Sequence, residues 1–210
     1  MNRIERVQCG KSNCYIISGN NNAVLVDTSL SPFREKILGV CKNKNIKLII
    51  LTHGHIDHIN NAAYLSEELE APIAIHKADY NITKDNKLEP LYAHNVLGKL
   101  VLAVLIKGIQ RMKTQPFEPE IFLYEGLSLK GYGVNARIIE LPGHTKGSIG
   151  IIVGETDIIV GDALMNIFYP CKSMLYENRK AMEQSAKRIS EFSGFTIYFG
   201  HGKPVINRVW

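Results

Sequence analysis

The chain has 210 residues, of which 45% are hydrophobic and 21% are charged, as in an ordinary globular protein. The formal net charge of +5 is mild and spread along the sequence, which argues against nucleic acid as a partner. No run of about 20 apolar residues is present that could span a bilayer, and the polar start of the chain does not resemble a signal peptide. We therefore expect a single domain over residues 1–210 in the cytoplasm, with a small-molecule substrate as its partner and no membrane contact.

Alternating strands and helices are predicted along the first half of the chain. Apolar runs rich in β-branched residues predict strands at residues 14–17, 23–27, 47–51 and 72–76. Residues 32–42 fit a helix with Ser31 as its N-cap and Pro32 at its first position. Residues 57–69 are predicted to form a second helix, because apolar side chains recur there at helical spacing.

The second half repeats this rhythm. Strands are predicted at residues 121–124, 136–141, 149–153, 157–161 and 196–199, and a helix at residues 178–192. Two mixed sheets packed face to face, with the helices outside, would bury all of these elements. The sequence therefore predicts an α/β fold built as a sandwich.

Residues 81–119 do not fit this pattern and are expected to form an apolar helical insertion. Nearly every side chain between residues 96 and 109 is apolar, and a helix of that composition must bury most of its surface. Three alternatives are open for what covers residues 88–112: the core or a sister subunit in a homo-oligomer, a substrate beneath a lid, or a membrane surface. Basic residues are few for the last of these.

The segment His53-Gly54-His55-Ile56-Asp57-His58 carries three imidazoles and a carboxylate between an apolar strand and a helix. Imidazole and carboxylate are the usual ligands of zinc and of non-haem iron. His53 and His55 alternate as at a strand end, so their side chains can converge on one point. Asp57 and His58 stand at the turn into the helix, where they can face a second point nearby.

Three later residues, His144, Asp162 and His201, each lie beside glycine directly after an apolar run. Glycine leaves room for a metal and a substrate to approach the backbone. The seven residues together offer five imidazoles and two carboxylates, whereas one tetrahedral metal needs three or four protein ligands. The set is therefore large enough for two metals that share a bridging ligand.

These motifs, in this order, resemble the metallo-β-lactamase fold superfamily of metal-dependent hydrolases, and the resemblance runs from Asn13 to Gly202. It implies a four-layer αβ/βα sandwich with the metals at one edge between the sheets. The ligands that it implies for a first metal are His53, His55 and His144, and those for a second are Asp57, His58 and His201. Asp162 would bridge the two metals, and Asp27 would support the site from behind its ligands. Within the superfamily, the size is similar to that of acyl-homoserine lactonases and the motifs to those of glyoxalase II.

The resemblance implies two divalent ions per chain, with zinc as the expected metal and iron or manganese as alternatives. Two dications about 3.5–4 Å apart can share one water, lower its pKa toward neutrality and let the bridging hydroxide attack an electrophilic centre. Asp57 is the expected catalytic residue, since it can orient the nucleophile or take its proton. The expected substrate is a small ester, thioester or lactone. The alternatives are a phosphodiester substrate and, in a different reaction class, an iron-dependent persulfide dioxygenase.

Overall fold

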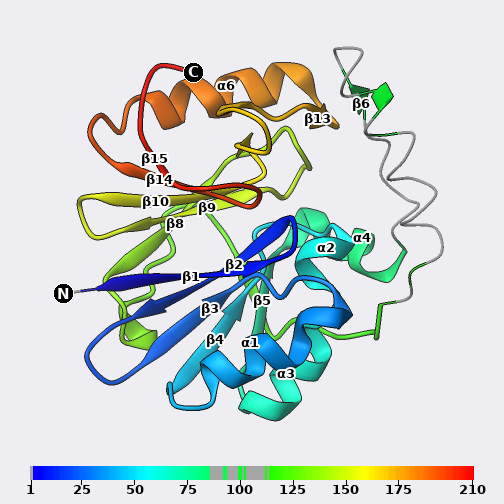
Figure 1. Cartoon of the computed structure of the whole chain (residues 1–210), viewed down its shortest axis with the longest axis vertical. Helices are drawn as coiled ribbons and strands as arrows, with labels where there is room; N and C mark the ends of the chain where they lie inside the picture. Colours follow the sequence, from blue (N-terminus) through cyan, green and yellow to red (C-terminus); the bar gives the residue numbers. More distant parts are fainter. Residues whose placement is uncertain (1, 86–91, 94–98, 101, 103–111, 113) are drawn as a thin grey trace.

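The computed structural model describes residues 2–85, 92–93, 99–100, 102, 112 and 114–210, and it has the predicted sandwich architecture. Two mixed sheets lie face to face (Figure 1). Helices α1 (Arg34–Cys41) and α3 (Ala62–Leu69) lie outside one sheet, and α6 (Arg179–Ser190) lies outside the other. Among the described residues, no helix combines the length and the apolar character needed to cross a membrane.

The first sheet has six strands in the order β1-β2-β3-β4-β5-β7. Their bounds are Arg3–Cys9 (β1), Ser12–Ser18 (β2), Ala23–Val26 (β3), Ile46–Ile50 (β4), Ile73–His76 (β5) and Ile121–Leu123 (β7). β1 to β3 are antiparallel, whereas β3, β4, β5 and β7 run parallel. β1 is absent from the predicted elements, because polar residues such as Arg3 and Glu5 hide the pattern of this edge strand.

The second sheet has five strands in the order β15-β14-β10-β9-β8. Their bounds are Ala136–Glu140 (β8), Ile149–Val153 (β9), Asp157–Gly161 (β10), Thr196–Phe199 (β14) and Val205–Ile206 (β15). α6 packs its apolar side on the outer face of this sheet, next to buried residues such as Ile158 and Ile197. Asn178 is the N-cap of this helix, and its side-chain oxygen accepts a hydrogen bond from the Ala181 N–H at 3.0 Å.

Strand β2 buries side chains on both of its faces. Ile16 faces the outer core beneath α1 and α3, whereas Tyr15 and Ile17 face the core between the sheets. On the opposite sheet, Ile151 and Ile159 fill the same inner core. Each such buried apolar side chain contributes about 1.5–3 kcal/mol. A shift of β2 by one residue would turn Tyr15, Ile16 and Ile17 to the opposite face of the sheet.

Two predicted helices differ from expectation at their boundaries. The chain enters α1 through a 3-10 turn, Ser31–Phe33 (η1), whose N-cap is Leu30 and not Ser31. The predicted helix 57–69 is two helices, α2 (Ile56–Ile59) and α3. Asn61 separates them because its amide nitrogen donates to the carbonyl oxygens of Thr28 and Leu30, at 2.8 Å each. These long-range hydrogen bonds override the local helical pattern.

Short elements complete the fold. β11 (Leu164–Met165) pairs with β12 (Cys171–Lys172), and β13 (Leu175–Tyr176) pairs with β6 (Tyr92–Ala93). Two more 3-10 turns, Lys77–Asp79 (η2) and Lys130–Tyr132 (η3), flank the first sheet, and α4 (Tyr80–Lys84) follows η2. The expected insertion therefore includes a short strand, residues 92–93. The apolar segment 88–112 and the helix predicted at 96–109 lie largely outside the described residues. The structure describes only residues 92–93, 99–100, 102 and 112 of this segment.

Candidate metal centre

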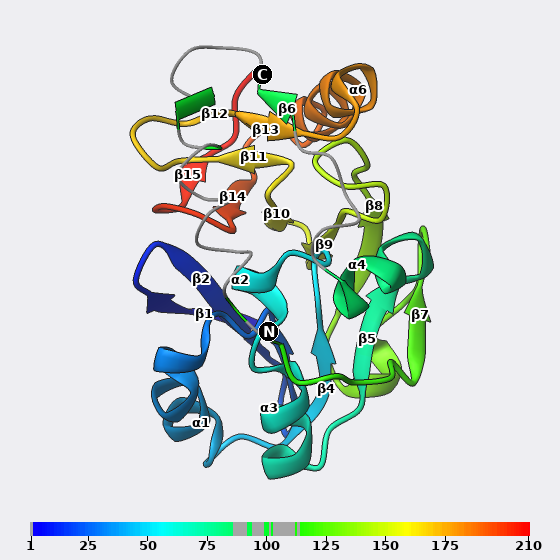
Figure 2. The ribbon, with the colours of Figure 1, turned by 90° about the vertical axis from the view of Figure 1, so that its right-hand side faces the viewer.

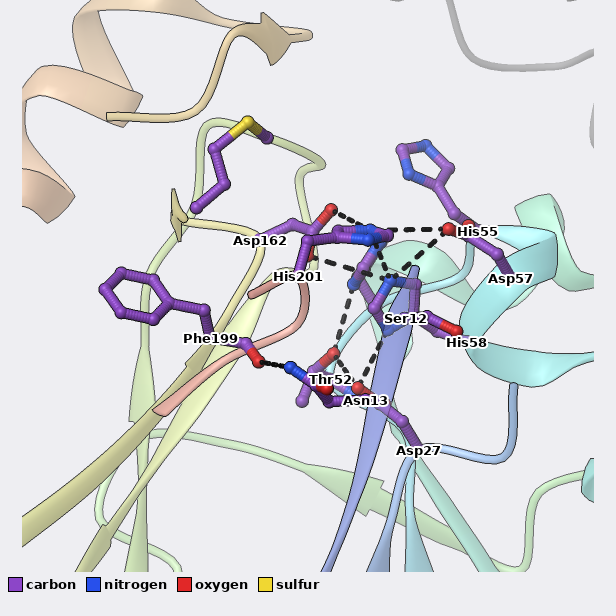
Figure 3. A network of polar contacts seen from close by, with 12 residues as sticks. Ser12, Asn13, Asp27, Thr52, His55, Asp57, His58, Asp162, Phe199 and His201 are labelled. Atoms are coloured by element: carbon purple, nitrogen blue, oxygen red, sulfur yellow. Dashed lines mark hydrogen bonds and ion pairs between the residues drawn. The ribbon is translucent and has the colours of Figure 1, made fainter. Parts of the chain in front are cut away.

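The seven candidate ligands meet at one edge of the sandwich, where strands of both sheets end. His53 and His55 lie in the loop after β4, and Asp57 and His58 lie on the short helix α2 that follows. The other three follow strands of the second sheet: His144 after β8, Asp162 after β10 and His201 after β14. Figure 3 shows Asp162 and His201 facing His55, Asp57 and His58 across this edge.

One group consists of His53, His55 and His144, whose ligand atoms lie within 4.8 Å of one another. The Nε2 atom of His144 is 2.9 Å from Nδ1 of His55. The Nδ1 atom of His144 lies 2.8 Å from the carbonyl oxygen of Leu175, and a carbonyl can only accept. The proton is therefore on Nδ1, and the Nε2 lone pair of His144 faces the site.

A second group consists of Asp57, His58 and His201. The Nε2 atom of His201 is 3.3 Å from Oδ2 of Asp57 and 3.4 Å from Nε2 of His58. Both imidazoles are oriented from behind: His201 Nδ1 donates to the carbonyl oxygen of Lys11 at 2.9 Å, and His58 Nδ1 to Asp27 at 2.8 Å. Their Nε2 atoms are thus directed at the same point.

Asp162 lies between the two groups. Its Oδ2 atom is 3.6 Å from Nε2 of His144 and 3.2 Å from Nε2 of His201. Its Oδ1 atom is 3.7 Å from Nε2 of His58. One carboxylate therefore reaches imidazoles of both groups, which is the position that a bridging ligand requires.

Several buried atoms of the candidate ligands lack a hydrogen-bond partner among the described residues. Three buried polar atoms at the centre, His53 Nε2, His55 Nε2 and Asp162 Oδ1, have no hydrogen-bond partner. A buried polar atom without a partner costs about 1–3 kcal/mol. Unpaired buried atoms on three of the candidate ligands, all of types that bind zinc or iron, fit a metal centre.

Burial and neighbouring charges shift the pKa values of four candidate imidazoles, two downward and two upward. Burial and the charges of neighbouring imidazoles lower the pKa of His53, and burial together with His144 lowers the pKa of His55 to about 3. Burial also opposes protonation of His58 and His201, but carboxylates outweigh it there. Asp27 raises the pKa of His58 to about 9, and Asp162 raises the pKa of His201 well above its ordinary value. Metal ions at this centre would therefore displace protons from one pair of imidazoles.

Asp27 supports the centre as the resemblance implies. It follows β3 with a left-handed φ of 59°, a conformation that is unfavourable for most non-glycine residues. Its Oδ1 atom accepts from the Thr52 N–H at 2.8 Å, and its Oδ2 atom accepts from Thr52 Oγ1 at 2.9 Å. The same Oδ2 atom holds His58, so Asp27 connects the end of β3 to the ligand segment.

Asp79 is a residue that the sequence patterns did not single out. Its side chain is completely buried, and it accepts three hydrogen bonds. Oδ2 accepts from the Gly54 N–H at 2.9 Å and from Thr145 Oγ1 at 2.7 Å, and Oδ1 accepts from the Gly147 N–H at 2.6 Å. Asp79 therefore joins the loop of His53 and His55 to the loop of His144. An aspartate in a turn is ordinary, so the sequence gives no signal for this role.

The glycines beside the ligands are required by close packing. A Cβ atom on Gly200 would collide with Asp162 Oδ1 and lie 2.8 Å from Cε1 of His58. A Cβ atom on Gly147 would lie 2.7 Å from Cγ of Asp79. Gly200 and Gly147 therefore leave room for the side chains of Asp162, His58 and Asp79.

Asn13 joins the two halves next to His201. Its side-chain amide donates to the carbonyl oxygens of Phe199 at 2.9 Å and Gly202 at 2.8 Å. Its backbone N–H donates to the carbonyl oxygen of Gly200 at 2.8 Å. Strand β2 of the first sheet therefore fixes the segment that carries His201 on the second (Figure 3).

Comparison with known proteins agrees with this architecture. A protein named "Probable metallo-hydrolase MJ0888", from Methanocaldococcus jannaschii, is 32% identical over 157 residues, which are 73% of this chain and 67% of that protein. The "Hydroxyacylglutathione hydrolase GloC" of Haemophilus influenzae is 32% identical over 125 residues, 57% of this chain and 50% of that protein. Among solved structures, TTHA1623 in a di-iron-bound form has a TM-score of 0.71 at 23% identity, covering 97% of this chain and 94% of that chain.

The family model described as the metallo-beta-lactamase superfamily matches residues 7–201, which include every candidate ligand. That match covers both sheets and the edge at which they meet. The chain belongs to the metallo-beta-lactamase superfamily.

Proposed function

We propose that this protein is a hydrolase with two metal ions that acts on a small ester, thioester or lactone. The observation that carries the proposal is the position of Asp162. Its oxygens lie between 3.2 Å and 3.7 Å from imidazole nitrogens of both ligand groups. A carboxylate shared in this way supports a centre with two ions rather than one.

In this proposal each ligand group holds one ion, and Asp162 is common to both. When bound, the two ions supply Lewis acidity toward the substrate oxygen and lower the pKa of water in the centre. The chain's own contribution is preorganisation, because the ring atoms on the far side of the site are already hydrogen-bonded. The acceptors that hold the imidazoles are Lys11, Asp27 and Leu175.

Asp57 is the residue proposed to orient the nucleophile. Its side chain is 33% exposed, whereas the side chains of His58 and Asp162 are 0% and 6% exposed. Of these three groups, Asp57 thus faces the open side from which substrate and water arrive. Although burial opposes ionisation, the charge of His58 holds the pKa of Asp57 well below its ordinary value. The carboxylate is therefore ionised at neutral pH and able to orient a nucleophile.

The substrate class follows from the chemistry of the site and from one relative. Water activated by metal ions needs no serine or cysteine nucleophile, so in this proposal the acyl group is transferred directly to water. The relative named as a hydroxyacylglutathione hydrolase is named for a substrate whose acyl group is carried on sulfur, and it matches about half of its own length. This supports thioesters as the first class to test, without specifying the thiol.

The test combines metal analysis with a substrate panel. Protein purified without added metal is analysed for metal content, then stripped and reloaded with zinc, iron(II) or manganese(II), since the donor set suits all three. Each form is assayed with a thioester, a lactone, a carboxylic ester and a phosphodiester, and oxygen uptake is measured with a persulfide. We expect two ions per chain and turnover of an acyl substrate without oxygen uptake.

Two results would overturn the proposal. The first is an active, folded protein that holds a single ion. The second is a protein that is inactive on all acyl substrates in every metal form. Turnover of the phosphodiester alone, or oxygen uptake by the iron form with a persulfide, would assign the corresponding alternative activity.

A further inference from the structure

A cleft of about 440 Å³ lies outside the metal centre. It is lined by residues of the β11–β12 hairpin and by Arg208, Val209 and Trp210 of the tail segment, residues 207–210. Figure 2 shows the ribbon of the hairpin and of the end of the chain. The side chains that matter for its chemistry are Tyr169, Lys172, Met174, Arg208 and Trp210. None of these is a candidate metal ligand, so the cleft is a separate feature of the surface.

The tail segment is fixed by specific contacts. The side-chain amide of Asn207 donates to the carbonyl oxygens of Ile189 and Phe192, at 2.7 Å each. The indole N–H of Trp210 donates to Asn207 Oδ1 at 2.7 Å. The indole ring also packs edge-on against Phe199, with 6.3 Å between ring centroids. The tail segment is thus anchored to α6 and β14.

Arg208 connects the tail segment to the hairpin. Its guanidinium carbon lies 4.7 Å from the centroid of the Trp210 ring, in a cation–π arrangement. The guanidinium also donates to the carbonyl oxygen of Pro170 on the hairpin. A guanidinium has five N–H donors, and the hydrogen bond to Pro170 uses one of them among the described residues, so Arg208 has further donors with which to bind an anion.

Two basic side chains, Lys172 and Arg208, line the cleft, and none of the described residues that line it has a carboxylate side chain. Within the described part of the chain, neither cation takes part in an ion pair. Tyr169, Met174 and Trp210 add apolar and aromatic surface beside these charges. A volume of this size is typical of small-molecule sites, which occupy about 300–1,000 Å³.

We propose that this cleft binds a small organic anion that carries an apolar or aromatic group. The anionic group, a carboxylate or a phosphate, pairs with Lys172 and Arg208. The apolar group lies against Trp210 and Met174. The site is linked to the metal centre through the backbone, because the Asn166 N–H at the start of the hairpin donates to the carbonyl oxygen of His201 at 2.8 Å.

Trp210 makes the proposal directly testable, because it is the single tryptophan of the chain. The metal-loaded protein is titrated with benzenesulfonate, an aromatic anion that is a weak metal ligand, while tryptophan fluorescence is recorded. Benzyl alcohol tests the ring without the charge, and methanesulfonate tests the charge without the ring. We expect a saturable change with benzenesulfonate and much weaker effects with the other two compounds. Benzoate and phenylphosphonate are titrated in parallel, and the tighter of them identifies the preferred anionic group.

Variants locate the binding. Lys172→Ala and Arg208→Ala are each expected to weaken benzenesulfonate binding about tenfold, since each removes a charged hydrogen-bond donor. Lys180→Ala, at an exposed position of α6, is the matched control and is expected to bind like the wild type. Equilibrium dialysis serves as a second measurement, because Arg208→Ala also changes the surroundings of Trp210. The proposal is overturned if no anion binds more tightly than benzyl alcohol, or if both variants bind as the wild type does.

Discussion

Asp79 allows a sharp test of how the metal centre is held. The substitution Asp79→Asn keeps the size of the side chain but replaces one acceptor oxygen by an NH₂ group. In the wild type, Oδ1 accepts from Gly147 and Oδ2 accepts from Gly54 and Thr145. Whichever way the amide is turned, at least one buried N–H then faces another donor.

The expected cost of Asp79→Asn follows from this one unpaired donor. One buried donor left without an acceptor costs about 1–3 kcal/mol. Burial raises the pKa of Asp79, so the loss of a buried carboxylate recovers part of this cost. Because the two loops joined by Asp79 carry three of the candidate ligands, we expect metal affinity to fall about 10- to 100-fold. Asp79→Ala removes both acceptor oxygens and is expected to be more damaging still.

The measurement is a competition titration with a chromophoric chelator, together with urea unfolding of the metal-free protein. Asp157→Asn is the matched control, since Asp157 lies at the opposite end of β10 from Asp162. The reasoning is refuted if Asp79→Asn binds metal as tightly as Asp157→Asn does, or if its metal affinity falls only because the protein is unfolded.

Three other predictions follow from the centre. Asp162→Ala should lower metal content and turnover with little effect on the stability of the metal-free protein; two ions in this variant would exclude a bridging role. Gly200→Ala should lower metal affinity because its Cβ would collide with Asp162, whereas Gly39→Ala, with open space around it, should not. For the metal-free protein, stability should be greatest near neutral pH in urea titrations. The contribution of His58 is complete below its unfolded pKa of about 6.5 and is lost as pH rises through about 9, by about 3 kcal/mol. The contribution of His55 is complete above about 6.5 and is lost as pH falls toward about 3. A metal-free protein whose stability is flat from pH 6 to about 9 would contradict the charges assigned to His58.

The elements that the sequence predicted best are those buried on both faces. β9 and β10 have the predicted bounds, because continuous apolar runs can satisfy their burial only as inner strands. β1 was missed because it is an edge strand with polar side chains, and its partner β2 supplies most of the apolar surface. The division of helix 57–69 was missed for another reason. Asn61 is an acceptable helix residue, and only its contacts with residues 28–30, far away in the sequence, reveal the break.

The candidate ligands were predictable for a related reason. Five of the seven, His53, His55, His144, Asp162 and His201, lie beside glycine in loops that follow buried strands, and Asp57 and His58 complete the motif that begins at His53. The residues that hold the ligands carry no such mark. Asp27 is 31 residues from His58, and Asp79 is 66 residues from Thr145, so their roles appear only when the fold brings them together.

The polar groups that orient the candidate ligands, called the polar anchors here, come from elements other than those that carry the ligands. Three imidazoles are each held by a polar contact from another element, Asp27 for His58, Leu175 for His144 and Lys11 for His201. Asp79 joins the loop of His53 and His55 to the loop of His144. These contacts set ring orientation and tautomer, which an apolar core cannot do because dispersion has no direction. Changes in the apolar cores should therefore lower the stability of the protein and leave the geometry of the centre intact. Changes in the polar anchors should lower metal affinity as well as stability, because they release the orientation of the ligands.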